Sequence, residues 1–156
     1  MNNGETYSRR DRRAGRLLAI DFGLKRIGLA LCDPLFTFAY PFKTISNDKN
    51  TLKELNDIIT TQQVNKIIMG LPVKENGAPG SISEDVFKLK SRLENRFKIE
   101  VILRDESYTS FIAKDIIQKT VTKKSRRQNK ELVDQSAAAI ILQDYMDEMK
   151  KKGNNS

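Results

Sequence analysis

The stretch LLAIDFGLKRIGLALC, residues 17–32, decides the fold. Residues 17–20 and 27–32 are two short apolar runs, and the polar segment between them contains Gly23. Two such runs joined by a turn that contains glycine are typical of a β-hairpin. The chain is therefore expected to begin with an antiparallel pair of strands, the first of which ends at Asp21.

A third strand is expected at 36–44, at the edge of the sheet, because Pro41 cannot donate a ladder hydrogen bond. Apolar spacing then predicts, in order, a helix at 52–59, a strand at 66–71, a helix at 86–97, a strand at 99–104, a helix at 109–119 and a helix at 129–150. A meander followed by β-α-β crossovers predicts an α/β fold. We expect a five-stranded mixed sheet, with a three-strand antiparallel meander, two parallel strands and helices on both faces.

The length of 156 residues predicts a single domain, which we place at residues 16–150. Residues 1–15 are rich in arginine and are expected to form a flexible basic arm, and residues 151–156 a disordered tail. No window approaches the roughly 20 apolar residues that span a bilayer. The polar start does not resemble a signal peptide, so we expect a cytoplasmic protein with no membrane partner.

The composition excludes several kinds of catalysis. The chain has no histidine, which rules out Ser-His-Asp and Cys-His catalysis and imidazole metal sites. Cys32 is the only cysteine, so a thiolate zinc site and an intrachain disulfide are also excluded. We expect Cys32 to be a small buried side chain rather than a reactive thiol. Carboxylates, basic groups, hydroxyls and hard metal ions remain available.

The charge of the chain points to a polyanionic partner. Lysine and arginine total 28 against 20 acids, a formal net charge of +8. Residues 119–130 hold six basic residues, Arg126 and Arg127 among them, and no acid. This segment is either a grip on a nucleic-acid backbone or a solvated loop. Aromatic content is only 7%, and Tyr108 is the one aromatic residue expected to touch a base.

Three acids lie where an acid needs a partner. Asp21 ends an apolar strand, Glu106 follows the last strand, and Asp134 lies among apolar residues of the last helix. A divalent cation would satisfy all three, and one or two Mg²⁺ or Mn²⁺ ions suit attack of water on a phosphodiester. Simpler alternatives remain open. Asp21 could accept backbone N–H bonds in the turn, Glu106 could begin a helix, and Asp134 could pair with Lys130.

Four segments together resemble the YqgF/RuvX family of the RNase H-like superfamily. They are LLAIDFGLKRIGLALCDP (17–34), IIMGLPVKENGAPG (67–80), VILRDESYTS (101–110) and NKELVDQSAAAIILQDYM (129–146). They occur in family order and cover most of the chain. The resemblance implies an RNase H-like fold and a divalent-metal-dependent endonuclease that hydrolyses phosphodiester bonds.

The resemblance also assigns roles to residues. It implies that Asp21, Glu106 and Asp134 are catalytic and hold the metal. It implies that Lys25, Arg26 and Lys130 face substrate phosphates, Lys130 with a stabilising role in the reaction and the other two with a solvated turn as the alternative. Gly70 and Pro72 are expected to shape the edge of the site.

Two positions depart from the family pattern. Ser107 stands where the family usually has arginine, so that cation is missing or is supplied by Arg104 or by residues 123–127. Glu131 replaces a common glycine and adds negative charge near the expected site. Both departures bear on substrate choice more than on the chemistry.

The expected substrate is nucleic acid, either structured RNA or branched DNA. Maturation of the 5′ end of pre-16S rRNA, with ribosomal precursor particles as a further partner, is the favoured role, and cleavage of Holliday junctions is the alternative. A monomer suits the first and a homodimer the second. A non-catalytic nucleic-acid-binding module is the alternative of another class, whereas an actin-like ATPase would need a second domain that 156 residues do not supply.

Overall fold

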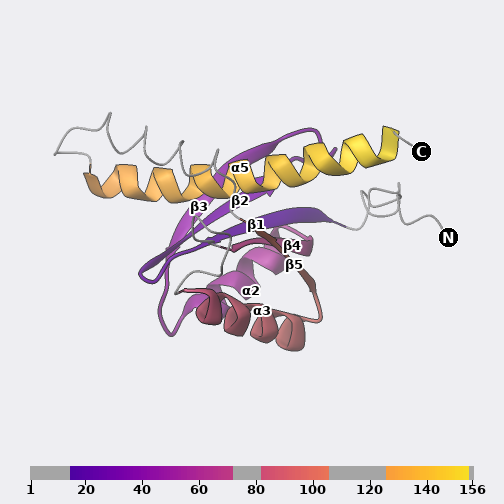
Figure 1. Ribbon diagram of the computed structural model, residues 1–156. Helices are drawn as coiled ribbons and strands as arrows, with labels where there is room; N and C mark the ends of the chain where they lie inside the picture. Colours follow the sequence, from indigo (N-terminus) through magenta and orange to yellow (C-terminus); the bar gives the residue numbers. More distant parts are fainter. Residues whose placement is uncertain (1–14, 72–81, 106–125, 155–156) are drawn as a thin grey trace.

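The computed structural model describes residues 15–71, 82–105 and 126–154. Its elements are, in chain order, β1 (Arg16–Phe22), β2 (Arg26–Cys32), β3 (Ala39–Ser46), α2 (Thr51–Thr61), β4 (Val64–Leu71), α3 (Ser83–Phe97), β5 (Glu100–Asp105) and α5 (Arg126–Asn154). The strands form one five-stranded sheet in the order β3-β2-β1-β4-β5, between two layers of helix (Figure 1).

The sheet is mixed, as the sequence predicts. β1 pairs antiparallel with β2, and β2 with β3, whereas β4 pairs parallel with both β1 and β5. Pro41 lies on the edge strand β3, where a missing N–H costs least, and the register shifts beside it between Leu29 and Ala30 of β2. The meander and the two parallel strands are therefore confirmed.

Alternate residues of the central strands enter two different apolar clusters. Leu18 and Ile20 of β1 pack in a cluster with residues of α2 and α3, whereas Leu17 and Ala19 pack with residues of α5. Because strand side chains alternate between faces, this assigns each position of β1 to one helix layer. Strands that bury both faces read as continuous apolar runs, which explains the composition of residues 17–32.

Helix α5 covers the meander side of the sheet, contacting chiefly β1, β2 and β3 (Figure 1). Its buried residues recur at helical spacing and are Val133, Ala137, Ala138, Ile141, Leu142, Tyr145 and Met146. Small residues at Ala137 and Ala138 allow the helix to lie close to the strands. The first turns of α5 lie over the end of the hairpin.

The last helix is longer than the predicted 129–150. It begins at Arg126 and continues to Asn154, so the expectation of a disordered tail is wrong for residues 151–154. Lys152 pairs with Glu148 one turn earlier at 3.6 Å, and basic side chains favour the negative end of the helix dipole. The expected basic arm, apart from Gly15, and the helix expected at 109–119 lie outside the described residues. No helix in the described part is long and apolar enough to cross a membrane.

Candidate active site

Asp21 lies in β1 at the carboxyl-terminal end of the apolar run and is 5% exposed. Its position in the alternation of β1 is shared with Leu17 and Ala19, so its side chain belongs to the α5 face of the sheet. A buried carboxylate requires compensation by hydrogen bonds, opposite charge or a cation. The carboxyl end of β1 therefore carries a polar group on a face that is otherwise apolar.

Gly28 joins Asp21 to helix α5. It is the cross-strand partner of Asp21, and such partners have Cα atoms about 4.5–5.5 Å apart. A β-carbon on Gly28 would lie 2.1 Å from the carbonyl oxygen of Asp134 and 2.8 Å from its β-carbon. The helix backbone at Asp134 thus rests directly on Gly28, and the two acids flank one glycine.

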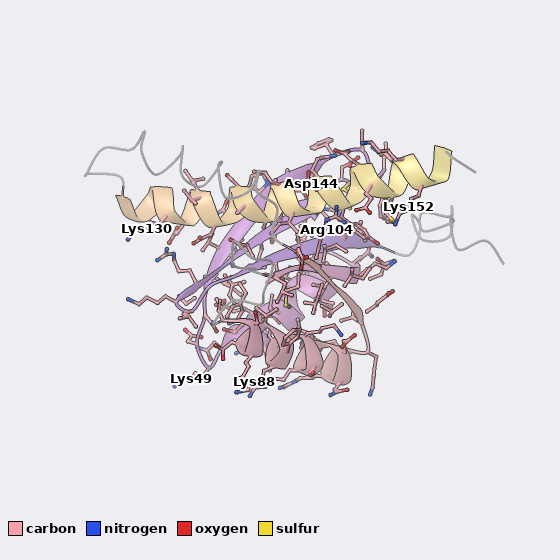
Figure 2. The ribbon with its side chains drawn as sticks, viewed as in Figure 1. Lys49, Lys88, Arg104, Lys130, Asp144 and Lys152 are labelled. Atoms are coloured by element: carbon pink, nitrogen blue, oxygen red, sulfur yellow. The ribbon has the colours of Figure 1, made fainter. Side chains whose placement is uncertain are left out.

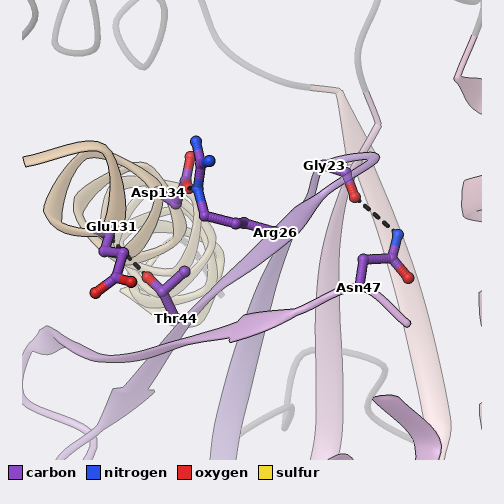
Figure 3. A network of polar contacts seen from close by, with 6 residues as sticks. All are labelled: Gly23, Arg26, Thr44, Asn47, Glu131 and Asp134. Atoms are coloured by element: carbon purple, nitrogen blue, oxygen red, sulfur yellow. Dashed lines mark hydrogen bonds and ion pairs between the residues drawn. The ribbon is translucent and has the colours of Figure 1, made fainter. Parts of the chain in front are cut away.

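Arg26 is the charged partner of Asp134. Its Nε donates to Oδ2 of Asp134 at 3.0 Å, with the two side chains 37% and 21% exposed (Figure 3). A pair this exposed contributes only about 0.2–1 kcal/mol after solvent screening. The alternative that Asp134 pairs with Lys130 is wrong, because no ion pair between them is present although the structure describes both side chains.

Three hydrogen bonds hold the end of the hairpin and the beginning of α5, and Figure 3 draws those made by the Asn47 and Thr44 side chains. Asn47 donates through Nδ2 to the carbonyl of Gly23 at 2.8 Å, and its backbone N–H donates to the carbonyl of Lys25 at 2.9 Å. Thr44 donates through Oγ1 to the backbone carbonyl of Glu131 at 2.7 Å. The turn and the first turns of α5 are therefore held by β3 and by the segment that follows it.

The parallel strands end at the same edge as β1. Ile20 is in register with Met69 of β4, and Leu71 with Asp105 of β5. Glu106 follows Asp105 in the sequence but lies outside the described residues, as do Ser107, Tyr108 and Pro72. Gly70 contributes to the shape of this edge, since a β-carbon there would lie 2.7 Å from Cδ1 of Ile141.

The structure thus brings together two of the three predicted acids. Within the described residues, no group of three or more His, Cys, Asp or Glu side chains is arranged to hold a metal ion. Asp21 and Asp134 supply hard oxygen donors, which Mg²⁺ and Mn²⁺ prefer, and Arg26 shows that this position already accommodates positive charge. The donor chemistry therefore fits a divalent cation.

The predicted basic residues have different surroundings. Lys25 is exposed in the hairpin turn. Lys130, labelled in Figure 2, is exposed near the beginning of α5. Arg126 and Arg127 open α5, but the described side chains of the helix begin at Lys130. Among the three predicted substrate-binding residues whose side chains the structure describes, Lys25, Arg26 and Lys130, only Arg26 has a charged partner.

Arg104, one candidate for the cation missing at Ser107, is paired away from Asp134. Its Nη1 pairs with Oε2 of Glu148 at 2.5 Å, and its guanidinium lies 6.0 Å from the ring centroid of Tyr145. This hydrogen bond lowers the pKa of Glu148. Glu148 is 14 residues beyond Asp134, which is about 21 Å along a helix.

Cys32 is the small buried residue that the sequence predicts. It is fully buried, accepts the backbone N–H of Leu17 at 3.2 Å, and burial raises its pKa. A buried thiol with a raised pKa is a poor nucleophile. Cys32 therefore belongs to the packing of the sheet against α5.

Comparisons with a family model and with curated relatives identify the family. The family described as "RuvX: Holliday junction resolvase" matches residues 15–148. Relatives named "Putative pre-16S rRNA nuclease" include one from Sulfurihydrogenibium sp., 35% identical over 86% of this chain and 91% of its own. Another, from Clostridium tetani, is 40% identical over 88% of this chain and 99% of its own. The crystal structure of the fowlpox virus resolvase with substrate Holliday junction DNA superimposes with a TM-score of 0.54 at 18% identity, covering 86% of this chain and 98% of that one. At this identity the likeness concerns the fold alone.

Proposed function

The chain belongs to the RuvX family, and from that premise we propose that it is a divalent-metal-dependent endonuclease acting on pre-16S rRNA. The observation that carries the proposal is the meeting of Asp21 and Asp134 around Gly28 at the end of the hairpin. The relatives' names support pre-16S rRNA as the substrate, and the proposal includes a reaction in the cytoplasm. The enzyme would bind this RNA as part of a ribosomal precursor particle.

The proposed site would hold one or two Mg²⁺ or Mn²⁺ ions with Asp21, Asp134 and Glu106. Such an ion lowers the pKa of bound water and neutralises charge on a phosphate. Asp21 is suited to a fixed position because its strand is buried on both faces, and Asp134 is held by the contact of α5 with Gly28. The carboxylates would hold the ions beside the scissile phosphate and would not themselves react.

The basic residues would hold the substrate backbone. Lys25 is exposed in the turn that follows the strand of Asp21, and Lys130 is exposed on the helix of Asp134, so both are free to meet phosphate oxygens near the acids. Arg26 lies between these elements and pairs with Asp134. Arg126 and Arg127 would extend the same positive surface along the beginning of α5.

Asp134→Asn and Asp21→Asn test the proposal. Each should reduce metal-dependent cleavage of a precursor 16S rRNA fragment by at least about a hundredfold, the usual cost of removing one preorganised electrostatic group. Asp144→Asn, on the same helix as Asp134 but 10 residues further on, is the matched control and should cleave normally. Circular dichroism and thermal unfolding of each variant establish that the fold is retained.

The assay also separates the alternatives. A four-way DNA junction is offered beside the RNA because the family is described by that substrate. Cleavage of the junction alone would replace RNA processing by junction resolution. Binding of both substrates without metal-dependent cleavage, by wild type and variants alike, would refute the nuclease and leave a binding module.

A further inference from the structure

A cavity of about 470 Å³ lies at the same end of the sheet as Asp21 but on the opposite face. It is formed by the end of the hairpin, the segment that begins α2, and one side of α3. Phe22, the residue after Asp21, is one of its walls and packs with the cluster on the α2 and α3 side. None of the residues that line it was predicted from the sequence to be a site residue.

The lining of the cavity combines four apolar side chains with polar and charged ones. Phe22, Leu24, Leu52 and Leu89 supply the apolar surface. Leu24 is 67% exposed at the tip of the hairpin, which is unusual for a large apolar side chain and leaves it available to cover a ligand. Its volume lies within the range of roughly 300–1,000 Å³ that ligand sites usually have.

Three cations, Lys49, Lys88 and Arg92, line the same cavity. All three are exposed, and none forms an ion pair with a residue in the described part of the chain. Figure 2 shows Lys49 and Lys88 on the helix layer opposite α5.

Two acids, Asp48 and Asp85, also line the cavity. Asp48 accepts the backbone N–H of Asn50 at 2.8 Å through Oδ1. Asp85 lies in the first turn of α3, where the helix dipole favours negative charge. Three cations against two acids leave the lining with a net positive charge, and the cations, which have no ion-pair partner in the described part of the chain, are available to an anion.

We propose that this cavity binds an unpaired nucleotide of the strand that the acidic site cleaves, an inference that rests on the proposed nuclease function. The apolar walls would receive the base, and Lys49, Lys88 and Arg92 would contact the adjoining phosphates. A positively charged groove combined with surfaces that cover bases is the usual way to bind single strands. A base still paired in a duplex could not enter.

The path from the acids to the cavity follows the hairpin end. Arg26 and Asp134 lie on the α5 face, Lys25 and Leu24 form the exposed turn, and Phe22 lies on the cavity side. A strand leaving the scissile phosphate would therefore pass the turn and place a neighbouring nucleotide in the cavity. The substrate class this implies is a single strand, or a duplex opened beside the cleavage position.

The test compares Lys88→Ala/Arg92→Ala with Lys53→Ala/Arg96→Ala. Both double variants remove two exposed cations from α2 or α3, but neither Lys53 nor Arg96 lines the cavity. Binding of a short fluorescein-labelled oligoribonucleotide is measured over a series of salt concentrations, in an Asp21→Asn background that keeps the strand intact. The slope of log K against log salt should fall in magnitude by up to about 1.4 in the first variant, because each single-strand phosphate contact contributes about 0.7. The control should keep the parental slope.

Abasic substitutions test the base. Placed one by one along the oligonucleotide, they should reveal a position where loss of the base weakens binding about tenfold. That loss should shrink in Leu24→Ala, whose side chain no longer covers the base. A deoxyribonucleotide probe of the same sequence should behave alike, because the proposed contacts are to base and phosphate.

The outcomes for the cavity and for the nuclease are separate. Equal slopes in the two double variants, no sensitive abasic position, or no binding of the probe would each overturn the cavity proposal, even if wild type cleaves RNA. A slope that falls as expected, in a protein that cleaves neither RNA nor a DNA junction, would support the cavity and refute the nuclease.

Discussion

Replacing Gly28 by alanine tests how the two carboxylates are held. The added methyl group would lie 2.1 Å from the carbonyl oxygen of Asp134 and 2.3 Å from its carbonyl carbon. Comfortable contacts between heavy atoms are about 3.5 Å, so α5 and β2 would have to separate by roughly 1 Å or more. The obstacle is backbone on the helix side, which cannot rotate away as the end of a long side chain can.

Both stability and activity should respond. Overpacking of this kind costs about 1–3 kcal/mol of unfolding free energy. Displacement of a catalytic group by about 1 Å can cost about a hundredfold in rate. Gly28→Ala should therefore lower kcat about a hundredfold while changing KM little, because the exposed cations that would hold the substrate backbone are untouched.

Urea unfolding followed by circular dichroism gives the first quantity, and cleavage of precursor RNA at saturating Mn²⁺ gives the second. Gly153→Ala is the matched control, because a β-carbon there meets no heavy atom within 4 Å. It should leave activity unchanged and stability unchanged or slightly higher, since alanine favours a helix over glycine by up to about 1 kcal/mol. A Gly28→Ala protein that is folded and cleaves at the wild-type rate would refute the argument that this contact positions Asp134.

Two further predictions concern charged residues. Arg26→Ala should strengthen Mn²⁺ binding to the free protein by up to about fivefold, because Asp134 loses a neutralising partner worth at most about 1 kcal/mol. Calorimetry against Arg104→Ala, an arginine paired elsewhere, checks this, and equal affinities in the two variants would contradict it. Partial burial alone would raise the pKa of Asp33, but backbone N–H groups of Phe38 and Thr37 lower it below the ordinary value of 3.8. The stabilisation by Asp33 is therefore complete at pH values above its ordinary pKa and is lost as the pH falls through its lowered pKa. Asp33→Asn should therefore have a lower free energy of unfolding in urea than wild type at neutral pH, and this difference should vanish in strong acid.

The apolar pattern was sufficient to predict the architecture. The apolar runs at 17–20 and 27–32 predict a hairpin and the segment 66–71 predicts a further strand, and each of them lies within an observed strand. The ends of elements were less predictable, because they depend on single contacts. The pairing of Lys152 with Glu148 is one such contact, and it accompanies a helix that continues beyond the predicted end.

The candidate site was predicted only in part. The unusual positions of Asp21 and Asp134 were visible in the sequence, but the pairing of Asp134 with Arg26 joins residues 108 positions apart and required the tertiary structure. Gly28 was missed, although an isolated glycine inside an apolar strand is a known sign of close backbone approach. Asn47 had no comparable signal, since its role depends on where the end of β3 meets the hairpin turn.

The packing explains why a polar group can be carried by a helix that otherwise buries apolar residues. Val133 and Ala137 on either side of Asp134 are buried against the sheet, so the helix cannot rotate to expose the carboxylate without losing both contacts. A strand residue with a side chain at the crossing point would lift this turn of the helix, whereas Gly28 allows the backbones to touch. Asp21 is the cross-strand neighbour of Gly28, so the same contact also fixes the spacing between Asp134 and Asp21. Sheet stability and the spacing of the two acids are consequently properties of one interface, which is why unfolding and cleavage must be measured on the same variants.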